Sequence, residues 1–365
     1  MGFLLPERNA GAGAQHTTNS MQPPFDISAD LDTPVSTYLK LAPLGPRYLL
    51  ESVEQGTQLS RYSFLGFGAA TEFRLDSSGV RASGKLLPRP ADQHALLARL
   101  RETLASAPRL APDAPGVPFD GGLVGFAAYD LVRQFERLPG PPAGPGSPLA
   151  PEAAYIATDS VLVFDHLTRR IALLHGGSEA ERQELRRDVM RLLRGPLPPA
   201  PEFRRYSPAQ QSLSEAEFMD AVARSKEYIR SGDIYQIVLS VRFAGEHQLS
   251  PFEAYRALRL LNPSPYMYFL DTGDLQVVGS SPEALVKLYE GDASLRPIAG
   301  TRPRGVDDAQ DVAHEKSLLS DEKELAEHVM LVDLARNDLG RVAAPGSVIV
   351  DPYQAIERYS HVMHI

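Results

Sequence analysis

Two glutamates on one predicted helix could hold a divalent metal ion. Glu324 and Glu327 lie three residues apart in the segment DEKELAEHVMLVDLARND, residues 321–338. This spacing places both carboxylates on one face of a helix, and Mg²⁺ typically binds proteins through one or two carboxylates and several waters. The alternative is a solvated helix face on which Lys323 pairs with Glu327. The spacing alone leaves both interpretations open.

A third carboxyl group could donate a proton. Glu283 follows Pro282 in SSPEALVKL, residues 280–288, where a predicted strand ends. Proline cannot donate a hydrogen bond to a sheet, and a carboxyl fixed at such a strand end could act as a general acid. An ordinary turn at the end of the strand explains the same residues.

A loop with a small residue and two arginines could hold a carboxylate ligand. In RPIAGTRPRG, residues 296–305, Gly300 and Thr301 offer a backbone amide and a hydroxyl, and Arg302 and Arg304 flank them. Arginine binds carboxylates through charge-assisted hydrogen bonds. A basic turn on the surface is the alternative.

Two histidines near residue 365 are candidates for acid–base chemistry. His361 and His364 lie three residues apart in ERYSHVMHI, residues 357–365, and would face one way if this segment were helical. Histidine is the usual proton carrier near neutral pH. Purely structural histidines are the alternative.

Two apolar segments with polar side chains could line a pocket for an aromatic ligand. They are LLES, residues 49–52, and NPSPYMYF, residues 262–269. Core strands explain the same pattern.

Helices and strands must position these groups. Capping signals predict a helix at 33–41, where Thr33 precedes Pro34, and a second helix after Ser214, whose capping box is completed by Glu217. Apolar spacing and boundary signals predict further helices at 94–106, 178–194, 251–262 and 321–338. Apolar patterns predict strands at 47–53, 60–68, 234–243, 265–271 and 275–281, a hairpin within 154–175, and a strand followed by a helix within 120–136.

Strands and helices do not alternate in regular βαβ units, so the fold class is predicted to be α+β with largely antiparallel sheets. Proline-rich stretches at 138–152 and 195–208 interrupt the pattern. The predicted organisation is a disordered extension at 1–20, an N-terminal domain at 21–194, a linker at 195–212 and a second domain at 213–365.

Composition narrows the class of protein. Thirty-seven Lys and Arg against 46 Asp and Glu give a net charge of −9 without a basic cluster, which argues against nucleic-acid binding. The 43% hydrophobic and 23% charged residues are typical of a soluble globular protein. The chain has no cysteine, which excludes disulfides and thiolate metal sites, and no run of about 20 apolar residues that could cross a membrane. We expect a cytoplasmic protein with neither nucleic acid nor membrane as a partner.

Taken in chain order, the motifs resemble the chorismate-utilising enzymes, and specifically anthranilate synthase component I. The segments that carry the resemblance are YLLESVEQGTQLSRYSFLGFG, GGLVGFAAYDLVRQFERLP, NPSPYMYF, SSPEALVKL, RPIAGTRPRG, DEKELAEHVMLVDLARNDLGRV and ERYSHVMH. The resemblance runs from about Met21 to Ile365. It implies a two-domain α+β fold in which helices pack on antiparallel sheets.

The resemblance also implies a reaction. Anthranilate synthase converts chorismate and ammonia to anthranilate and pyruvate with Mg²⁺ as cofactor, the first committed step of tryptophan biosynthesis. A partner, the glutamine amidotransferase subunit (component II), supplies the ammonia, and L-tryptophan acts as feedback inhibitor.

Roles follow for residues that match the motifs of this family. Glu327 matches a Mg²⁺ ligand and Glu324 a nearby acidic residue, and Gly300 and Thr301 match a loop that contacts chorismate, with Thr301 also in a catalytic position. Glu283 matches the general acid that protonates the departing C4 hydroxyl of chorismate.

His364 matches the catalytic histidine of the step that eliminates pyruvate. Four further residues match the site of the inhibitor L-tryptophan: Ser52, Pro265, Tyr266 and Met267.

Ala299 separates two related activities. Aminodeoxychorismate synthases typically have a lysine at this position, and a lysine can act as a nucleophile or base whereas alanine cannot. Ala299 therefore favours anthranilate synthase over aminodeoxychorismate synthase component I, which is the alternative enzyme. A non-catalytic module that binds tryptophan is the alternative from another class.

The family continues beyond the position that matches Ile365, and the resemblance places there a second Mg²⁺-binding glutamate and further groups that grip chorismate. The chorismate-binding domain is therefore expected to be incomplete in these 365 residues, which we expect to be inactive on their own.

Overall fold

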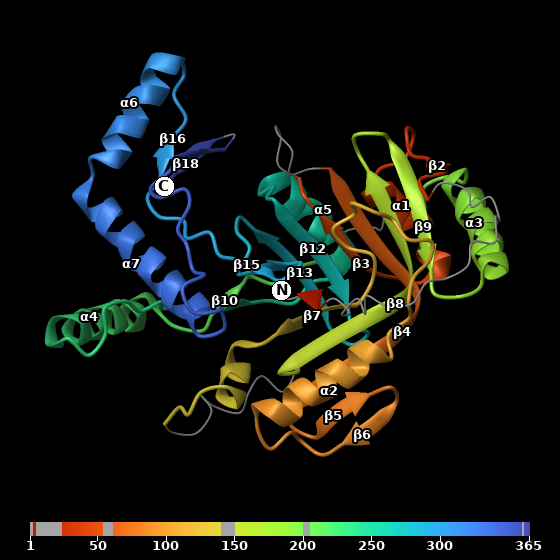
Figure 1. Ribbon diagram of the computed structural model, residues 1–365, viewed down its shortest axis with the longest axis horizontal. Coiled ribbons are helices and arrows are strands. Elements are labelled where there is room, and N and C mark those ends of the chain that lie inside the picture. Colours follow the sequence, from red (N-terminus) through yellow and green to blue (C-terminus); the bar gives the residue numbers. More distant parts are fainter. Residues whose placement is uncertain (1–2, 5–23, 54–60, 140–149, 200–204, 360) are drawn as a thin grey trace. The chain divides into compact units, whose positions relative to one another are not determined.

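The computed structural model describes residues 3–4, 24–53, 61–139, 150–199, 205–359 and 361–365 (Figure 1). Within this part of the chain, one large antiparallel sheet dominates. Its central path of neighbouring strands is β1 (Phe3–Leu4), β7 (Leu123–Ala127), β8 (Ala153–Asp165), β4 (Tyr62–Asp76), β3 (Pro46–Glu51), β12 (Tyr266–Asp271) and β13 (Gln276–Ser281). The strands that join this path at its sides are β2 (Ile27–Ser28), β5 (Gly79–Ala82), β6 (Lys85–Leu87) and β9 (Arg170–His175).

Long central strands explain how the sheet holds together. The strands β4 and β8 pair from Tyr62 opposite Asp165 to Leu75 opposite Ala153, with one irregularity (Figure 1). Nearly every side chain of β8 is buried. Because a strand covered on both faces does not alternate apolar and polar residues, the two apolar runs of β8, residues 153–157 and 161–164, fit its position in the sheet.

Three helices accompany this sheet in the first half of the chain, and each begins at a residue that caps it. Thr33, Asp92 and Ser178 accept hydrogen bonds from backbone amides at the starts of α1 (Pro34–Lys40), α2 (Gln93–Ala105) and α3 (Glu179–Leu193). The described residues also include short 3₁₀ helices at Ala42–Leu44 and Tyr129–Gln134.

The chain separates into two compact units, Met1–Leu197 with Tyr255–Ile365, and Pro198–Ala254. The second unit contains α4 (Glu215–Ser231) and the paired strands β10 (Gln210–Gln211) and β11 (Phe243–Ala244). The helix α5 (Pro251–Leu261) crosses the division. These units differ from the predicted division at 195–212, because β12 pairs with β3 and so joins the later chain to the first sheet.

Elements after β13 carry most of the chemistry-bearing motifs. The helices α6 (Asp308–Leu319) and α7 (Glu322–Gly340) follow one another, and β16 (Arg302–Pro303), β18 (Val362–His364) and β17 (Glu357–Arg358) form a small antiparallel sheet. A separate hairpin consists of β14 (Lys287–Tyr289) and β15 (Asp292–Ser294). Leu318 of α6, Met363 of β18 and Ile365 form one buried cluster. Full burial of such a side chain stabilises a fold by about 1.5–3 kcal/mol.

The structure confirms the α+β class with antiparallel sheets, the caps at Thr33 and Ser214, and the hairpin of residues 265–281. The predicted strand at 234–243 is wrong, since only Phe243 belongs to a strand. A 3₁₀ helix replaces the α-helix expected near residue 130. Apart from Phe3 and Leu4, the predicted extension at 1–20 lies outside the described residues. No helix of the described chain combines the length and apolarity that a membrane span requires.

Candidate active site

A short turn and one strand bring together residues that are distant in the sequence. Both backbone groups of Ala299 bond to Ile365, with N···O distances of 3.1 Å in each direction, and Arg302 pairs with Met363 in the sheet. Residues 362–364 form a strand, so the condition under which His361 and His364 would share one helical face is not met. His361 lies outside β18, and its backbone oxygen accepts a hydrogen bond from Arg304 N.

A ring nitrogen of His364 contacts the turn formed by Gly300 and Thr301. Its Nδ1 atom lies 2.9 Å from the carbonyl oxygen of Gly300 and 3.1 Å from the Thr301 hydroxyl oxygen. A carbonyl oxygen can only accept, so Nδ1 carries the proton and Nε2 of the neutral ring keeps its lone pair. Neither the sequence spacing nor the family resemblance predicted this contact, although the resemblance had assigned all three residues to the active site.

Gly300 allows the turn to approach the metal-binding candidate. Its φ of +66° is in the left-handed region, which other residues rarely adopt. A Cβ atom at this position would lie 2.8 Å from Leu318 Cδ1 and 3.2 Å from Glu324 Oε2. The Glu324 carboxylate at the start of α7 therefore lies directly beside the Gly300–Thr301 turn.

Glu324 and Glu327 are suitable in type and number for a partial Mg²⁺ site. Both are half-buried on α7, and neither forms an ion pair among the contacts described. The pair of Lys323 with Glu327, which the alternative interpretation required, is not among those contacts. The described residues contain no group of three or more His, Cys, Asp or Glu side chains that could enclose a metal. Two carboxylates that leave positions for substrate and water match the usual Mg²⁺ arrangement.

Glu283 and Glu357 lie in different electrostatic environments, which shift their pKa values in opposite directions. The side chain of Glu283 is exposed, yet desolvation by the groups around it raises its pKa; Arg296, and His364 when protonated, oppose this shift, and Glu357 adds to it. Burial also acts on Glu357, but hydrogen bonds from Arg296 and Tyr359 outweigh it and lower the pKa of Glu357. Glu283 is therefore the carboxyl of this pair more suited to hold a proton.

Three further residues of this site were missed by the sequence analysis. Arg296 pairs with Glu357, and the Tyr359 hydroxyl donates to Glu357 Oε2 at 2.8 Å. The ring of Tyr359 also lies edge-on to His364, with centroids 5.6 Å apart. Glu357 and Tyr359 are two residues apart, a spacing that places both side chains on one face of a strand. This spacing could have identified them from the sequence.

The contacts of Arg302 and Arg304 argue against the hypothesis that these arginines bind a carboxylate ligand. Arg302 pairs with Asp321 at 2.8 Å, and Arg304 pairs with Asp311 at 2.8 Å. Both guanidinium groups are thus committed to carboxylates of the protein itself.

The residues matched to a tryptophan site lie at one end of the β3–β12 pair. Met267 is opposite Glu51 in the sheet, and the Val53 amide donates to Ser264 O beyond it. This pairing brings Ser52 close to the segment that contains Pro265 and Tyr266. The Ser52 hydroxyl is buried and has no hydrogen-bond partner among the described residues.

A buried ion pair supports this end of the sheet and was also missed. Glu51 is 6% exposed and accepts hydrogen bonds from the Tyr255 hydroxyl at 2.5 Å and from Arg259 Nε at 3.0 Å. Burial, and then the nearby Glu51 charge, raise the pKa of Tyr255. Tyr255 therefore remains a hydrogen-bond donor at neutral pH.

Comparison with known proteins places this geometry in a family. The model of the chorismate binding enzyme family matches residues 45–365. The chain belongs to the chorismate-binding enzyme family.

Within this family, the chain is similar to curated proteins named anthranilate synthase component 1. The chain is 46% identical over 341 residues to anthranilate synthase component 1 of Thermus thermophilus, covering 92% of this chain and 72% of the relative. It is 42% identical over 364 residues to the same component of Pseudomonas aeruginosa, covering 93% and 72%.

Solved structures agree with this result. Anthranilate synthase component I of Streptococcus pneumoniae superposes with a TM-score of 0.70 at 29% identity, covering 95% of this chain and 75% of that one. The menaquinone-specific isochorismate synthase of Escherichia coli, at 14% identity and a TM-score of 0.55, shares the fold.

Proposed function

We propose that this chain is the chorismate-converting component of an anthranilate synthase. The observation that carries the proposal is that Thr301, His364 and Glu324 meet at the Gly300 turn, in a chain that is 46% identical to anthranilate synthase component 1 of Thermus thermophilus. The reaction would convert chorismate and ammonia into anthranilate, pyruvate and water. A glutamine amidotransferase partner would supply the ammonia.

Each residue has a chemical task in this proposal. Glu283, with its raised pKa, donates a proton to the C4 hydroxyl of chorismate, which then leaves as water. His364, whose Nε2 is free to accept, takes the ring proton when the ring becomes aromatic and pyruvate is eliminated. Thr301 and the backbone at Gly300 orient the substrate.

The metal would be held by Glu327, with Glu324 beside it. Bound Mg²⁺ supplies positive charge that neutralises a substrate carboxylate and polarises the ring. Glu324 lies next to Gly300, so a carboxylate that would help to hold the ion stands beside the turn that orients the substrate.

The regulatory part of the proposal concerns Ser52, Pro265, Tyr266 and Met267. The buried, unpartnered hydroxyl of Ser52 supports a ligand site here, because an unsatisfied buried polar group costs about 1–3 kcal/mol. L-tryptophan is the proposed ligand and feedback inhibitor.

Aminodeoxychorismate synthase component I is the second candidate, since it uses the same substrate. Ala299 is 5% exposed and offers only a methyl group beside the turn, so it supplies no lysine nucleophile. This observation favours anthranilate synthase.

Calorimetric titration with chorismate tests the proposal. We expect saturable binding that requires Mg²⁺, because two carboxylates of this chain and the anionic substrate would share the ion. A folded protein that binds no chorismate would contradict the proposal.

A further inference from the structure

The segment that contains the Gly300 turn is fastened along α6. Its residues contact successive turns of that helix in reverse order: Arg304 Nε meets Asp311 Oδ1 at 2.8 Å, Pro303 O meets His314 Nδ1 at 2.7 Å, and Arg302 Nε meets Ser317 Oγ at 3.4 Å. Gly300 then lies against Leu318 at the end of the helix. The helix thus determines where the turn lies.

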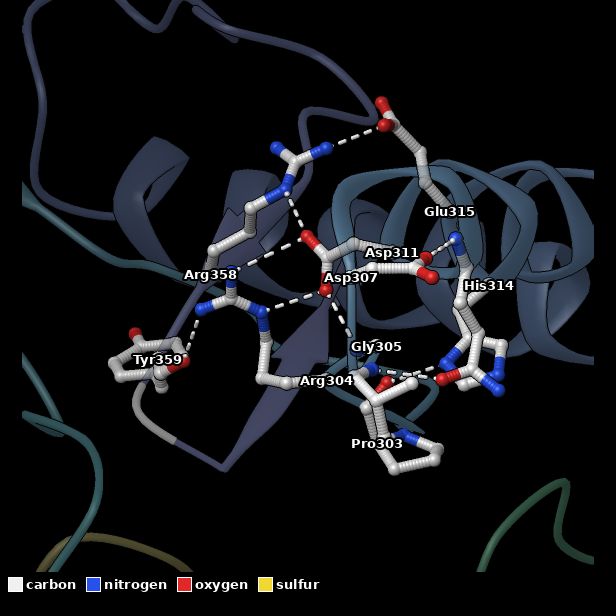
Figure 2. A network of polar contacts seen from close by, with 11 residues as sticks. Pro303, Arg304, Gly305, Asp307, Asp311, His314, Glu315, Arg358 and Tyr359 are labelled. Atoms are coloured by element: carbon white, nitrogen blue, oxygen red, sulfur yellow. Dashed lines mark hydrogen bonds and ion pairs between the residues drawn. The ribbon is translucent and has the colours of Figure 1, made fainter.

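Near the start of α6, the contact between the segment and the helix is a dense ionic network (Figure 2). Asp311 is 8% exposed and accepts hydrogen bonds from Arg304, from the Gly305 amide at 2.8 Å and from Arg358 Nε at 3.2 Å. Arg304 Nη1 also donates to Tyr359 O at 2.7 Å. The network ties α6 to the strand that precedes β18, and so anchors the small sheet.

At the other end, Arg302 connects the turn to α7. Its Nη1 donates to Thr301 O at 3.0 Å and its Nη2 donates to Asp321 Oδ2 at 2.8 Å. The other oxygen of Asp321 accepts from the amides of Lys323 and Glu324 at 3.1 and 3.3 Å, and so caps the helix. One carboxylate therefore joins the turn to the helix that carries Glu324 and Glu327.

Thr301 is consequently held from both sides. The peptide group before it is fixed by His364 Nδ1 at Gly300 O, and the peptide group after it by Arg302. Rotation of either peptide would move the hydroxyl. Because Arg302 has a planar fork of donors, it can serve Thr301 O and Asp321 at once, which a lysine cannot do in the same geometry.

We propose that Arg302 and Asp321 are positioning residues: their ion pair locks the Gly300–Thr301 turn to the start of α7 and thereby keeps His364 bonded through Nδ1 to Gly300. The geometric part of this proposal stands on the contacts above. Its importance for chorismate chemistry rests on the proposed function.

Nitrogen NMR of protein labelled at histidine tests the proposal without substrate or metal. The His364 resonances are identified by their loss in His364→Asn. In the wild type we expect the Nδ1–H tautomer. In Asp321→Asn, whose side chain still caps a helix, and in Arg302→Lys, we expect the His364 resonances to shift towards the mean of the two tautomers.

The matched control is Asp307→Asn. Asp307 caps α6 through Gln310 N at 2.8 Å, as Asp321 caps α7, but no ion pair of Asp307 is among the described contacts. We expect its His364 spectrum to equal that of the wild type. An Nε2–H tautomer in the wild type, unchanged His364 resonances in folded Arg302→Lys and Asp321→Asn, or an equal shift in Asp307→Asn would overturn the proposal. If one variant fails to fold, the other decides. Failure to bind chorismate would refute the proposed function without altering these outcomes.

Discussion

The Nδ1 atom of His364 lies 2.9 Å from the carbonyl oxygen of Gly300, 64 residues earlier in the chain. The carbonyl fixes the proton on Nδ1 and leaves Nε2 as the basic atom of the neutral ring. A strand from the end of the described chain thereby supplies a base to a turn at residue 300.

Two substitutions distinguish the contribution of the Nδ1 hydrogen bond to stability from that of the rest of the His364 ring. His364→Asn places an amide N–H near the position of Nδ1, whereas His364→Gln places one near Nε2. We expect His364→Gln to lower the free energy of unfolding by about 1 kcal/mol, the net value of one hydrogen bond, and His364→Asn to lower it by less. Urea unfolding measures both. Equal losses would show that the Gly300 contact contributes nothing to stability.

Gly300→Ala should be more damaging than a glycine substitution in open space. Forcing a left-handed conformation on alanine costs about 1–2 kcal/mol, and crowding against the buried Leu318 adds about 1–3 kcal/mol. Gly291→Ala is the control, since Gly291 has a φ of +91° but no heavy atom within 4 Å of an added Cβ. Similar losses of unfolding free energy for the two variants would contradict the close packing at Gly300.

Glu283 and Glu357 should affect stability with opposite dependence on pH. The folded protein raises the pKa of Glu283, so it resists ionisation of this group, and this residue costs stability as pH rises above its ordinary value. The folded protein lowers the pKa of Glu357, so the stability from this residue is present at higher pH and is lost as pH falls through the lowered value.

Melting temperatures between about pH 3 and pH 7 test this pair. With rising pH, the wild type should lose stability relative to Glu283→Gln and gain stability relative to Glu357→Gln. Parallel curves, or slopes of the same sign, would refute the assignment of Glu283 as the protonated partner.

The tryptophan site can be tested directly because the chain contains no tryptophan. Emission from L-tryptophan therefore reports only the ligand, and its anisotropy should rise and saturate as protein is added. Ser52→Phe should abolish the rise by filling the space beside the buried hydroxyl, and phenylalanine should not compete. Ser77→Phe, in an exposed turn of the same sheet, is the control. A cooperative melt without saturable binding would refute this regulatory site.

Local signals predicted the elements well where side chains determine the backbone. The Ser214–Glu217 capping box and the Thr33 cap appear as expected, since both satisfy amides within one turn. Residues 234–242 have an apolar pattern but no strand partner in the described chain, so their alternation was misleading. A periodic pattern does not tell whether a neighbouring strand is available.

Residue spacing predicted the candidate site less well than it predicted the helices and strands. Thr301 and His364 are separated by 63 residues, and only the family resemblance connected them. Arg302 and Arg304 suggested a ligand, but their carboxylate partners Asp321 and Asp311 lie on two helices whose placement the sequence does not reveal. Long-range pairing of charges depends on the tertiary fold.

We propose that α7 and the Gly300 turn form one Mg²⁺-dependent site for chorismate. The most direct test is calorimetric titration of chorismate with Mg²⁺ and with a chelator, for the wild type, Glu327→Gln and Glu322→Gln. Glu322 is an exposed glutamate in the first turn of the same helix and serves as the control. We predict binding that requires Mg²⁺, a loss of at least about tenfold in affinity for Glu327→Gln, which corresponds to about 1.4 kcal/mol, and no change for Glu322→Gln. Equal affinity with and without Mg²⁺, or equal losses in both variants, would contradict the account.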